Sequence, residues 1–256
     1  MWIATWNVNS IRARRERLLA WLEKRQPDVV LLQELKCQLE DFDALDLASL
    51  GYHAAANTQK TYNGVAILSK TPLDDVRMGL DDGVEDPQAR LIAATTRGIR
   101  FLSAYVPNGS EVGSEKWFYK LQWLDRLRAY LERNCDPKAP LVLGGDFNVA
   151  PDERDVHDPQ AWEDTVLFHP EARAAYRRVL EWGLEDSFRV LHDQPKTYSW
   201  WDYRMLAFPK NRGLRIDLLL TSAPLRDRVL ESFVDRDERK GKQPSDHAPV
   251  LLRLAD

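Results

Sequence analysis

Short apolar runs alternate with helical patterns along the whole chain, and this alternation is typical of an α/β fold. The runs that are short, rich in β-branched or aliphatic residues and bounded by turn signals are predicted strands. They lie at Met1–Trp6, Val29–Leu32, Val65–Ser69, Leu91–Thr96, Ile99–Tyr105, Leu141–Gly144, Ile216–Thr221 and Pro249–Leu254.

Three segments show apolar residues at helical spacing. The clearest is 114–133, with Ser114 as the N-cap and an apolar stripe formed by Trp117, Leu121, Leu124, Leu127 and Leu131. Arg12–Arg25 is a second predicted helix, and Pro170–Trp182 is a third, with proline at its first turn and Gly183 after its end. No Ser- or Gly-rich linker divides the chain, so we expect one catalytic domain over residues 1–256, with two packed sheets and helices outside.

Polar signatures follow the apolar strands at six places. Ligand sites in layered α/β proteins collect at strand ends, so these signatures predict one shared site. They are ATWNVNSIRAR from Ala4, VVLLQELK from Val29, YVPNGS from Tyr105, GGDFNVAP from Gly144, RIDLLLTS from Arg215 and PSDHAPV from Pro244.

The composition is that of an ordinary globular protein, with 44% hydrophobic and 30% charged residues. Two distant cysteines form no disulfide framework or zinc motif, which indicates a reducing compartment, and we expect a cytoplasmic location. The amino end does not resemble a signal peptide, and no apolar run approaches the roughly 18 residues that span a bilayer. The formal net charge of −4 argues mildly against a nonspecific polyanion binder.

Carboxylate and amide side chains stand where the predicted strands end. Asp146 and Asn148 are two residues apart, a spacing that places both on one side of a strand and suits orientation of a water. Glu34 and Asn7 follow two other strands and offer the oxygen ligands that Mg²⁺ prefers. Each also fits a structural interpretation, as a turn residue or a carboxylate at the start of a helix.

An Asp–His arrangement is suggested by two further segments. Asp217 stands in an otherwise apolar strand, where a carboxylate needs a partner, and Asp246-His247 precedes the last strand. A structural Asp–His hydrogen bond is the alternative. Tyr105 and Asn108 end another strand, although Pro-Asn-Gly is also a turn signal. Together these residues suit metal-assisted hydrolysis of a phosphate ester.

The order of these motifs resembles the exonuclease III family of DNA-repair nucleases, in the endonuclease/exonuclease/phosphatase superfamily. The likeness rests on Asn7, Glu34, YVPNG from Tyr105, GDFN from Gly145, Asp217 and SDH from Ser245, and it covers nearly the whole chain. WNVN from Trp6 and RAR from Arg12 are similar to the bacterial branch. The resemblance implies a four-layered α/β sandwich, with two facing β-sheets flanked by helices.

The same resemblance implies a role for each matched residue. Glu34 and Asn7 would bind a divalent metal, Mg²⁺ or Mn²⁺, with Asp246 nearby. Asp146 would orient or deprotonate the attacking water and Asn148 would fix it. Asp217 would hold His247, which would contact the scissile phosphate together with Tyr105. Asn108 would contact the phosphate or support Tyr105.

The family's slot for a flipped-out abasic sugar is matched by Trp200, Leu214 and Ile216, for which core packing is the alternative. Leu167 and His169 are bulky neighbours for that slot, and the Ser110-Glu111 loop tip has no cation. We therefore expect a monomeric enzyme that acts on 3′ ends of duplex DNA, as exonuclease, 3′-phosphatase or 3′-phosphodiesterase, with weaker incision at internal abasic sites.

Two other functions remain open from the sequence. One is a superfamily phosphoesterase acting on a phosphoinositide or sphingomyelin, and the segments from Arg215 and Trp6 favour DNA over these substrates. The other is a noncatalytic DNA-binding module, against which the complete set of polar residues argues. A turnover assay on each substrate separates the three.

Overall fold

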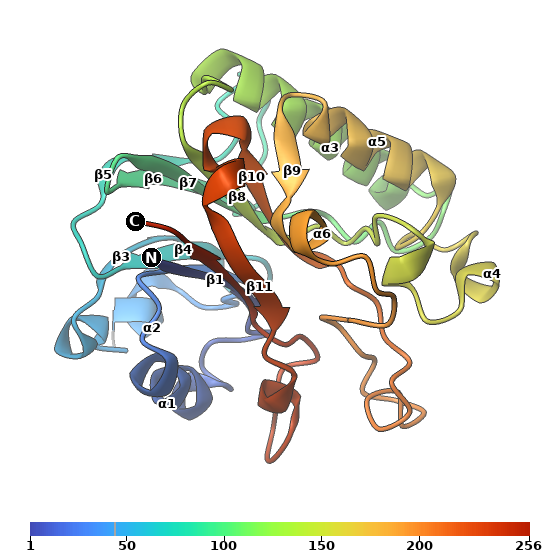
Figure 1. Ribbon diagram of the computed structural model, residues 1–256, viewed down its shortest axis with the longest axis horizontal. Coiled ribbons are helices and arrows are strands. Elements are labelled where there is room, and N and C mark those ends of the chain that lie inside the picture. Colours follow the sequence, from blue (N-terminus) through green and yellow to red (C-terminus); the bar gives the residue numbers. More distant parts are fainter. Residues whose placement is uncertain (44) are drawn as a thin grey trace.

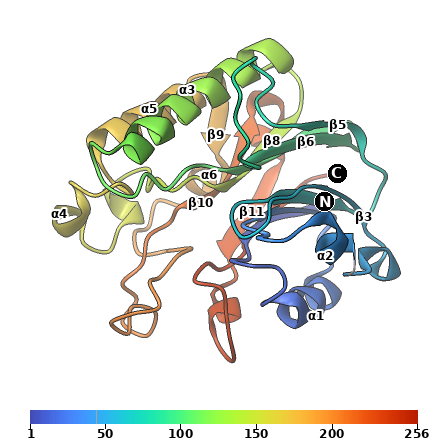
Figure 2. The same cartoon turned by 180° about the vertical axis from the view of Figure 1, so that it is seen from behind.

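The computed structural model describes residues 1–43 and 45–256, and two six-stranded sheets lie face to face at its centre (Figure 1). The first sheet has the order β11-β12-β1-β2-β4-β3, and the second has the order β5-β6-β7-β8-β10-β9. Helices α1 and α2 cover the first sheet, while α3 and α5 cover the second, as Figure 2 shows from behind. The predicted four-layered α/β sandwich is confirmed.

The strands of the first sheet are β1 (Trp2–Asn7), β2 (Val29–Gln33), β3 (His53–Asn57), β4 (Val65–Ser69), β11 (Val229–Val234) and β12 (Val250–Leu254). Those of the second are β5 (Asp74–Met78), β6 (Leu91–Thr96), β7 (Ile99–Tyr105), β8 (Leu141–Asp146), β9 (Leu184–Asp186) and β10 (Asp217–Ser222). The α-helices are α1 (Arg15–Arg25), α2 (Leu39–Asp43), α3 (Glu115–Asn134), α4 (Pro159–Trp162), α5 (Pro170–Leu180) and α6 (Ser187–Leu191). Short 3₁₀ turns lie at Leu47–Leu50, Glu153–Asp155, Ala223–Arg228 and Arg236–Arg239.

Aliphatic side chains fill the space between the two sheets. Leu31 of the first sheet and Phe101 and Leu219 of the second belong to one buried cluster. Burial of one such side chain stabilises the fold by about 1.5–3 kcal/mol. Gly144 faces this layer, because a Cβ built on it would lie 2.6 Å from both Leu31 Cδ1 and Leu219 Cδ2. The close packing of the sheets at this point therefore requires glycine.

The three predicted helices are present, with shifted ends. The Oγ of Ser114 accepts a hydrogen bond from the backbone N–H of Trp117 at 3.2 Å, as expected for the N-cap of α3. α1 begins at Arg15 rather than Arg12, because the preceding residues form a turn in which Ser10 has a φ of +83°. α5 ends at Leu180 rather than Trp182. In the part of the chain that is described, no helix is long and apolar enough to cross a membrane.

Four strands were not predicted, and they are short or lie toward the rims of the sheets. All five residues of β5 are exposed, and β3 has no buried residue. β11 joins the first sheet through β12, and the three-residue β9 forms an edge of the second sheet. A strand with little buried surface does not need a run of apolar residues. Strands of this kind therefore cannot be recognised from the hydrophobic pattern of the sequence.

The strand pairing brings the polar signatures to one edge of the sandwich. β1 runs parallel to β2, and β7 runs parallel to β8, so the carboxyl ends of each pair lie together. β10 runs antiparallel to β8, with Asp217 at its start opposite Asp146. A Cβ on Gly145 would lie 1.8 Å from the carbonyl oxygen of Ala104, so only glycine lets β7 and β8 pair at this point.

Candidate active site

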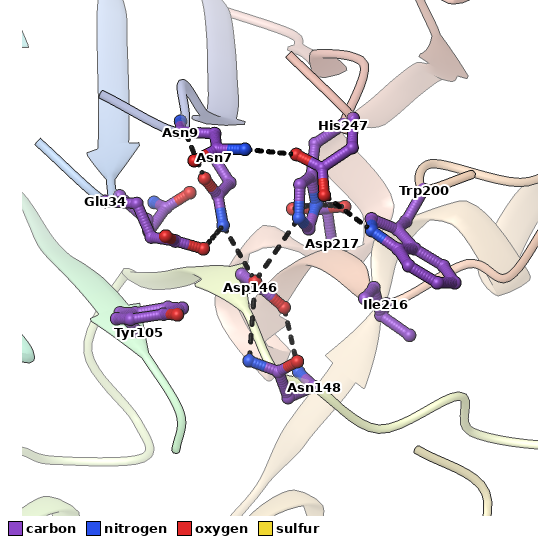
Figure 3. Close-up of polar contacts among 12 residues, drawn as sticks. Asn7, Asn9, Glu34, Tyr105, Asp146, Asn148, Trp200, Ile216, Asp217 and His247 are labelled. Atoms are coloured by element: carbon purple, nitrogen blue, oxygen red, sulfur yellow. Dashed lines mark hydrogen bonds and ion pairs between the residues drawn. The ribbon is translucent and has the colours of Figure 1, made fainter. Parts of the chain in front are cut away.

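Asn7 joins the two sheets at the centre of the site (Figure 3). It is the last residue of β1, and its Nδ2 donates to Glu34 Oε1 at 2.8 Å and to Asp146 Oδ2 at 2.9 Å. Glu34 follows β2 with a φ of +51°, which directs its carboxylate back over the sheet edge. Lys36 Nζ lies 2.6 Å from the other oxygen of Glu34. The predicted residues Asn7 and Glu34 therefore lie beside Asp146. Lys36, which was not predicted as a site residue, lies next to them.

Asp146 and Asn148 lie on the same side, as predicted, but the geometry is not that of a continuous strand. Asp146 ends β8, and Asn148 has a φ of +48°, so the backbone has left the extended conformation. The N–H of Asn148 donates to Asp146 Oδ1 at 2.9 Å, and its Nδ2 donates to the carbonyl of Val106 at 2.9 Å. This turn, rather than the two-residue period of a strand, holds the pair together.

Asp217 and His247 form a buried pair beside Asp146. The Nδ1 of His247 lies 2.8 Å from Asp217 Oδ2, and its Nε2 lies 3.7 Å from Asp146 Oδ2. Burial opposes the charge of His247, but the carboxylates of Asp217, Asp146 and Asp246 outweigh it and raise its pKa to about 10. The ring is thus an imidazolium at neutral pH, with Nδ1–H donating to Asp217 and Nε2–H directed toward Asp146.

The acid–base character of Asp146 is set by its surroundings. Burial raises the pKa of Asp146 to about 7; Asp217 and Glu34 act in the same direction, and His247 opposes them. A carboxylate with a pKa close to neutral can accept a proton from a bound water and remain ionised before it does so. Asp146 therefore has the character of a general base.

Tyr105 ends β7 at the edge of the same site. Burial, together with the charges of Glu34 and Asp146, raises the pKa of Tyr105 well above its usual range. The guanidinium of Arg90 stacks on its ring, with 4.7 Å between Cζ and the ring centroid. The phenol therefore stays protonated and can donate a hydrogen bond. Asn108 lies exposed beyond it, and its Nδ2 donates to Asn148 Oδ1 at 3.1 Å.

Asp246 lies on the other side of Asn7 and is held by two donors. Asn9 Nδ2 donates to one of its oxygens at 2.9 Å, and Trp200 Nε1 donates to the other at 3.0 Å. Burial acts against its charge, but His247 and the two donors hold the pKa of Asp246 below its usual range. Asp246 therefore links the segment of His247 to Trp200, which packs against an apolar cluster.

An apolar cluster borders the polar site. Leu214 and Ile216 are buried together with Leu167, and Trp200 packs against them at the rim. This is the group for which an abasic-sugar slot was predicted. His169 lies to one side of it: its ring contacts Trp117 with centroids 5.0 Å apart, and its Nδ1 accepts from the backbone N–H of Glu171 as the N-cap of α5.

The donor set suits a hard divalent cation. Ligand atoms of Glu34, Asp146 and His247 lie within 4.8 Å of one another. Glu34 is the least buried of the three, and carboxylate and amide oxygens are the ligands that Mg²⁺ and Mn²⁺ favour. A charged imidazolium is a poor ligand, so the oxygens of Glu34 and its neighbours are the better candidates.

Lys36, Asn9 and Arg90 were not assigned roles from the sequence, although each contacts a predicted site residue. Lys36 Nζ also donates to Asn9 Oδ1 at 2.7 Å, which ties Glu34 to the loop that holds Asp246. A weak signal for Lys36 was its position two residues after Glu34. Arg90 carried no such signal, because its partner Tyr105 lies on the neighbouring strand.

The sequence and the fold were compared with those of known proteins. The model of the endonuclease/exonuclease/phosphatase family matches residues 4–247. Exodeoxyribonuclease III of Haemophilus influenzae is 38% identical over 96% of this chain and 97% of its own length. The structure of an AP endonuclease from Archaeoglobus fulgidus has a TM-score of 0.97 and 40% identity, with full coverage of both chains. A Neisseria 3′ phosphatase bound to a product DNA hairpin has a TM-score of 0.96 and 39% identity, again with full coverage. The chain belongs to the endonuclease/exonuclease/phosphatase family, in its branch of exonuclease III and AP endonuclease phosphodiesterases.

Proposed function

We propose that this protein hydrolyses phosphate esters at the 3′ ends of duplex DNA during repair, by removing nucleotides or a 3′ phosphate. The observation that carries the proposal is that the general base Asp146 and the imidazolium of His247 face each other 3.7 Å apart, beside the carboxylate of Glu34. The relatives that are named for exonuclease, 3′-phosphatase and AP endonuclease activity support DNA as the substrate.

We assign each step of hydrolysis to a side chain of the site. Asp146 accepts a proton from a water that attacks phosphorus, and the bond to the leaving oxygen breaks on the opposite side. Asn148 holds that water against the phosphate. The Nε2–H of His247 and the phenol of Tyr105 donate to the phosphate oxygens, where negative charge builds in the transition state. Asp217 keeps His247 charged and oriented throughout.

The charge of the site supports a requirement for Mg²⁺ or Mn²⁺. The carboxylates of Glu34, Asp146, Asp217 and Asp246 surround one imidazolium, and Lys36 is already paired with Glu34. A phosphate entering this field would meet net negative charge. A divalent cation held by Glu34 and Asn7, with Asp246 nearby, would neutralise that charge and polarise the phosphate.

A surface for the DNA backbone lies at the start of α1. A cavity of about 670 Å³ is lined there by Arg12, Arg15, Arg17 and Lys242. Arg17 donates hydrogen bonds to the carbonyls of Lys242 and Glu238. Arg12 lies 3.8 Å from the carboxylate of Asp41, and its side chain is 64% exposed. Such cations suit phosphate contacts that do not depend on sequence, despite the acidic overall balance. We propose that a monomer binds duplex DNA through this face.

The apolar cluster beside the site supports a preference for 3′ ends over internal abasic sites. An internal cut requires the sugar to be flipped out and the duplex to be bent, which costs a few kcal/mol. Trp200, Leu214 and Ile216 would line a slot for that sugar, but Leu167 fills part of the same cluster. A 3′ end at a nick is already free on one side and needs less distortion.

The test is a parallel measurement on three duplexes that carry a 3′ phosphate at a nick, a recessed 3′ end or an internal abasic site. A phosphoinositide serves as the substrate of the competing function. We expect turnover of both 3′-end substrates at least as fast as that of the abasic site, and a kcat lowered by roughly 10²–10⁴ in Asp146→Asn. Faster turnover of the phosphoinositide than of any DNA would refute the proposed function. Light scattering on the same preparation tests the monomer.

A further inference from the structure

Lys120 is a fully buried cation in the middle of α3. Its Nζ donates to three backbone carbonyls, those of Asn108 at 3.1 Å, Asn148 at 2.6 Å and Val166 at 2.5 Å. An ammonium has three N–H donors, so its hydrogen-bonding capacity is used completely. Among the described residues, no carboxylate forms an ion pair with it.

The three acceptors come from separate loops that meet at the site. Asn108 follows β7, Asn148 follows β8, and Val166 precedes α5, the helix that packs with α3 over the second sheet (Figure 1). Lys120 therefore connects these three loops to helix α3 through hydrogen bonds. Gly109 permits the approach, because a Cβ at this position would lie 3.1 Å from Lys120 Cδ and its φ is +95°.

The bond to Asn148 matters most for the chemistry. Asn148 adopts the left-handed conformation, which costs energy for a residue with a side chain. Its N–H is held by Asp146 and its carbonyl by Lys120, so both polar groups of this peptide residue have partners. The same turn directs the side chain of Asn148 between Val106 and Asn108.

The charge of Lys120 carries a desolvation cost, which its three hydrogen bonds must offset. Burial lowers the pKa of Lys120 to about 7, and Asp146 opposes this shift from a distance. A buried cation without a carboxylate partner is expensive, and an apolar side chain of similar length would avoid the desolvation. The neutral carbonyls that the ammonium binds all belong to loops of the active site.

We propose that Lys120 is a positioning residue of the hydrolytic site, which holds the backbone of Asn148 so that the amide of this residue meets the attacking water. This inference rests on the proposed function. It predicts that loss of the ammonium lowers kcat, because the water is misplaced. KM for DNA should change little, because the proposed phosphate-binding surface at the start of α1 lies on the opposite side of the two sheets from α3 (Figure 1).

The test is a double-mutant cycle of Lys120→Met with Asn148→Ala, read out as kcat and KM on a duplex with a 3′ phosphate at a nick. We expect Lys120→Met alone to lower kcat about 10- to 100-fold, with KM within threefold. In the Asn148→Ala background the same change should lower kcat less than threefold, since the residue through which it acts is already removed. Equal effects in both backgrounds would overturn the proposal.

Leu124→Ala is the matched control, because Leu124 lies one turn further along α3 and is fully buried in the core without a bond to these loops. It should lower thermal stability and leave kcat within twofold. Should Lys120→Met not fold, Lys120→Gln, which keeps one donor group, replaces it in the cycle.

A crystal structure of the variant gives a readout that does not depend on substrate. We expect the Asn148 backbone to leave its positive φ or the bond from Asn148 to Val106 to be lost. An unchanged Asn148 would count against the proposal even if activity fell. Wild-type protein that turns over no DNA would instead refute the proposed function. The conformation of Asn148 in the variant would then still decide whether Lys120 positions this residue.

Discussion

Replacement of Asp217 by asparagine should weaken catalysis through His247 without disturbing the fold. Asp217 is fully buried, and asparagine has nearly the same shape, so the packing around β10 is kept. The change replaces the carboxylate that accepts a hydrogen bond of 2.8 Å from His247 with an uncharged amide oxygen. Bonds to charged groups are worth about 1–2 kcal/mol more than neutral bonds. If the whole of that difference is added to the activation free energy, kcat falls about 5- to 30-fold at neutral pH.

The loss should grow as the pH rises. Burial alone would lower the pKa of His247. The carboxylates of Asp217, Asp146 and Asp246 outweigh burial and raise this pKa to about 10. Removing the charge of Asp217, the largest of these contributions, lets the pKa of His247 fall. The imidazolium is then lost at a lower pH, and activity should decline between pH 7 and 9 more steeply than in the wild type.

The assay is single-turnover release of phosphate from a nicked duplex at pH 6, 7, 8 and 9. Asp82→Asn is a suitable control, because that carboxylate accepts two hydrogen bonds from Arg126 and contacts neither Asp217 nor His247. It should change the profile little. A profile of Asp217→Asn parallel to that of the wild type, with kcat within threefold, would show that the carboxylate does not sustain the imidazolium.

Four other changes test separate parts of the structure. Asp146→Asn should lower kcat by roughly 10²–10⁴ in a protein with an unchanged melting curve, and a loss below threefold would remove it as the base. Glu34→Gln should weaken Mn²⁺ binding measured by calorimetry, and full wild-type activity in excess chelator would contradict the metal requirement. Asp155→Ala deprives the buried Arg215 of a partner at 2.6 Å and should lower the free energy of unfolding in urea by about 3–5 kcal/mol; a change below 1 kcal/mol would contradict this. Leu167→Gly should raise abasic-site cutting relative to 3′-phosphate removal in paired assays, because Leu167 is buried with Leu214 and Ile216. An unchanged ratio would show that this side chain does not restrict the proposed slot.

The strands that carry the site could be predicted because they are buried on both faces. β2, β8 and β10 are buried along their whole length, so they appear in the sequence as largely apolar runs. The polar residue that follows such a run is then visible as an interruption, as with Glu34. β5 is exposed along its whole length and could not be recognised in this way.

The conformation of the strand ends could not be predicted. Asp146 and Asn148 were expected to share a side through the period of a strand, whereas a left-handed residue at Asn148 brings them together. Glu34 also has a positive φ, where glycine, asparagine or aspartate is the usual residue. These conformations are imposed by contacts with other loops, so the local sequence carries little trace of them.

Lys120 shows where a pattern of hydrophobic and polar residues misleads. It lies three residues after Trp117 and four before Leu124, and so occupies the buried stripe of α3. A lysine at such a position contradicts the apolar period, and this contradiction was the available signal. Its meaning depends on three carbonyls from residues 12 to 46 positions away. The residues to which we assign the chemistry could be found from the sequence because each stands near one end of a predicted strand. The cation that holds three of their loops could be understood once the fold had brought those loops to one point.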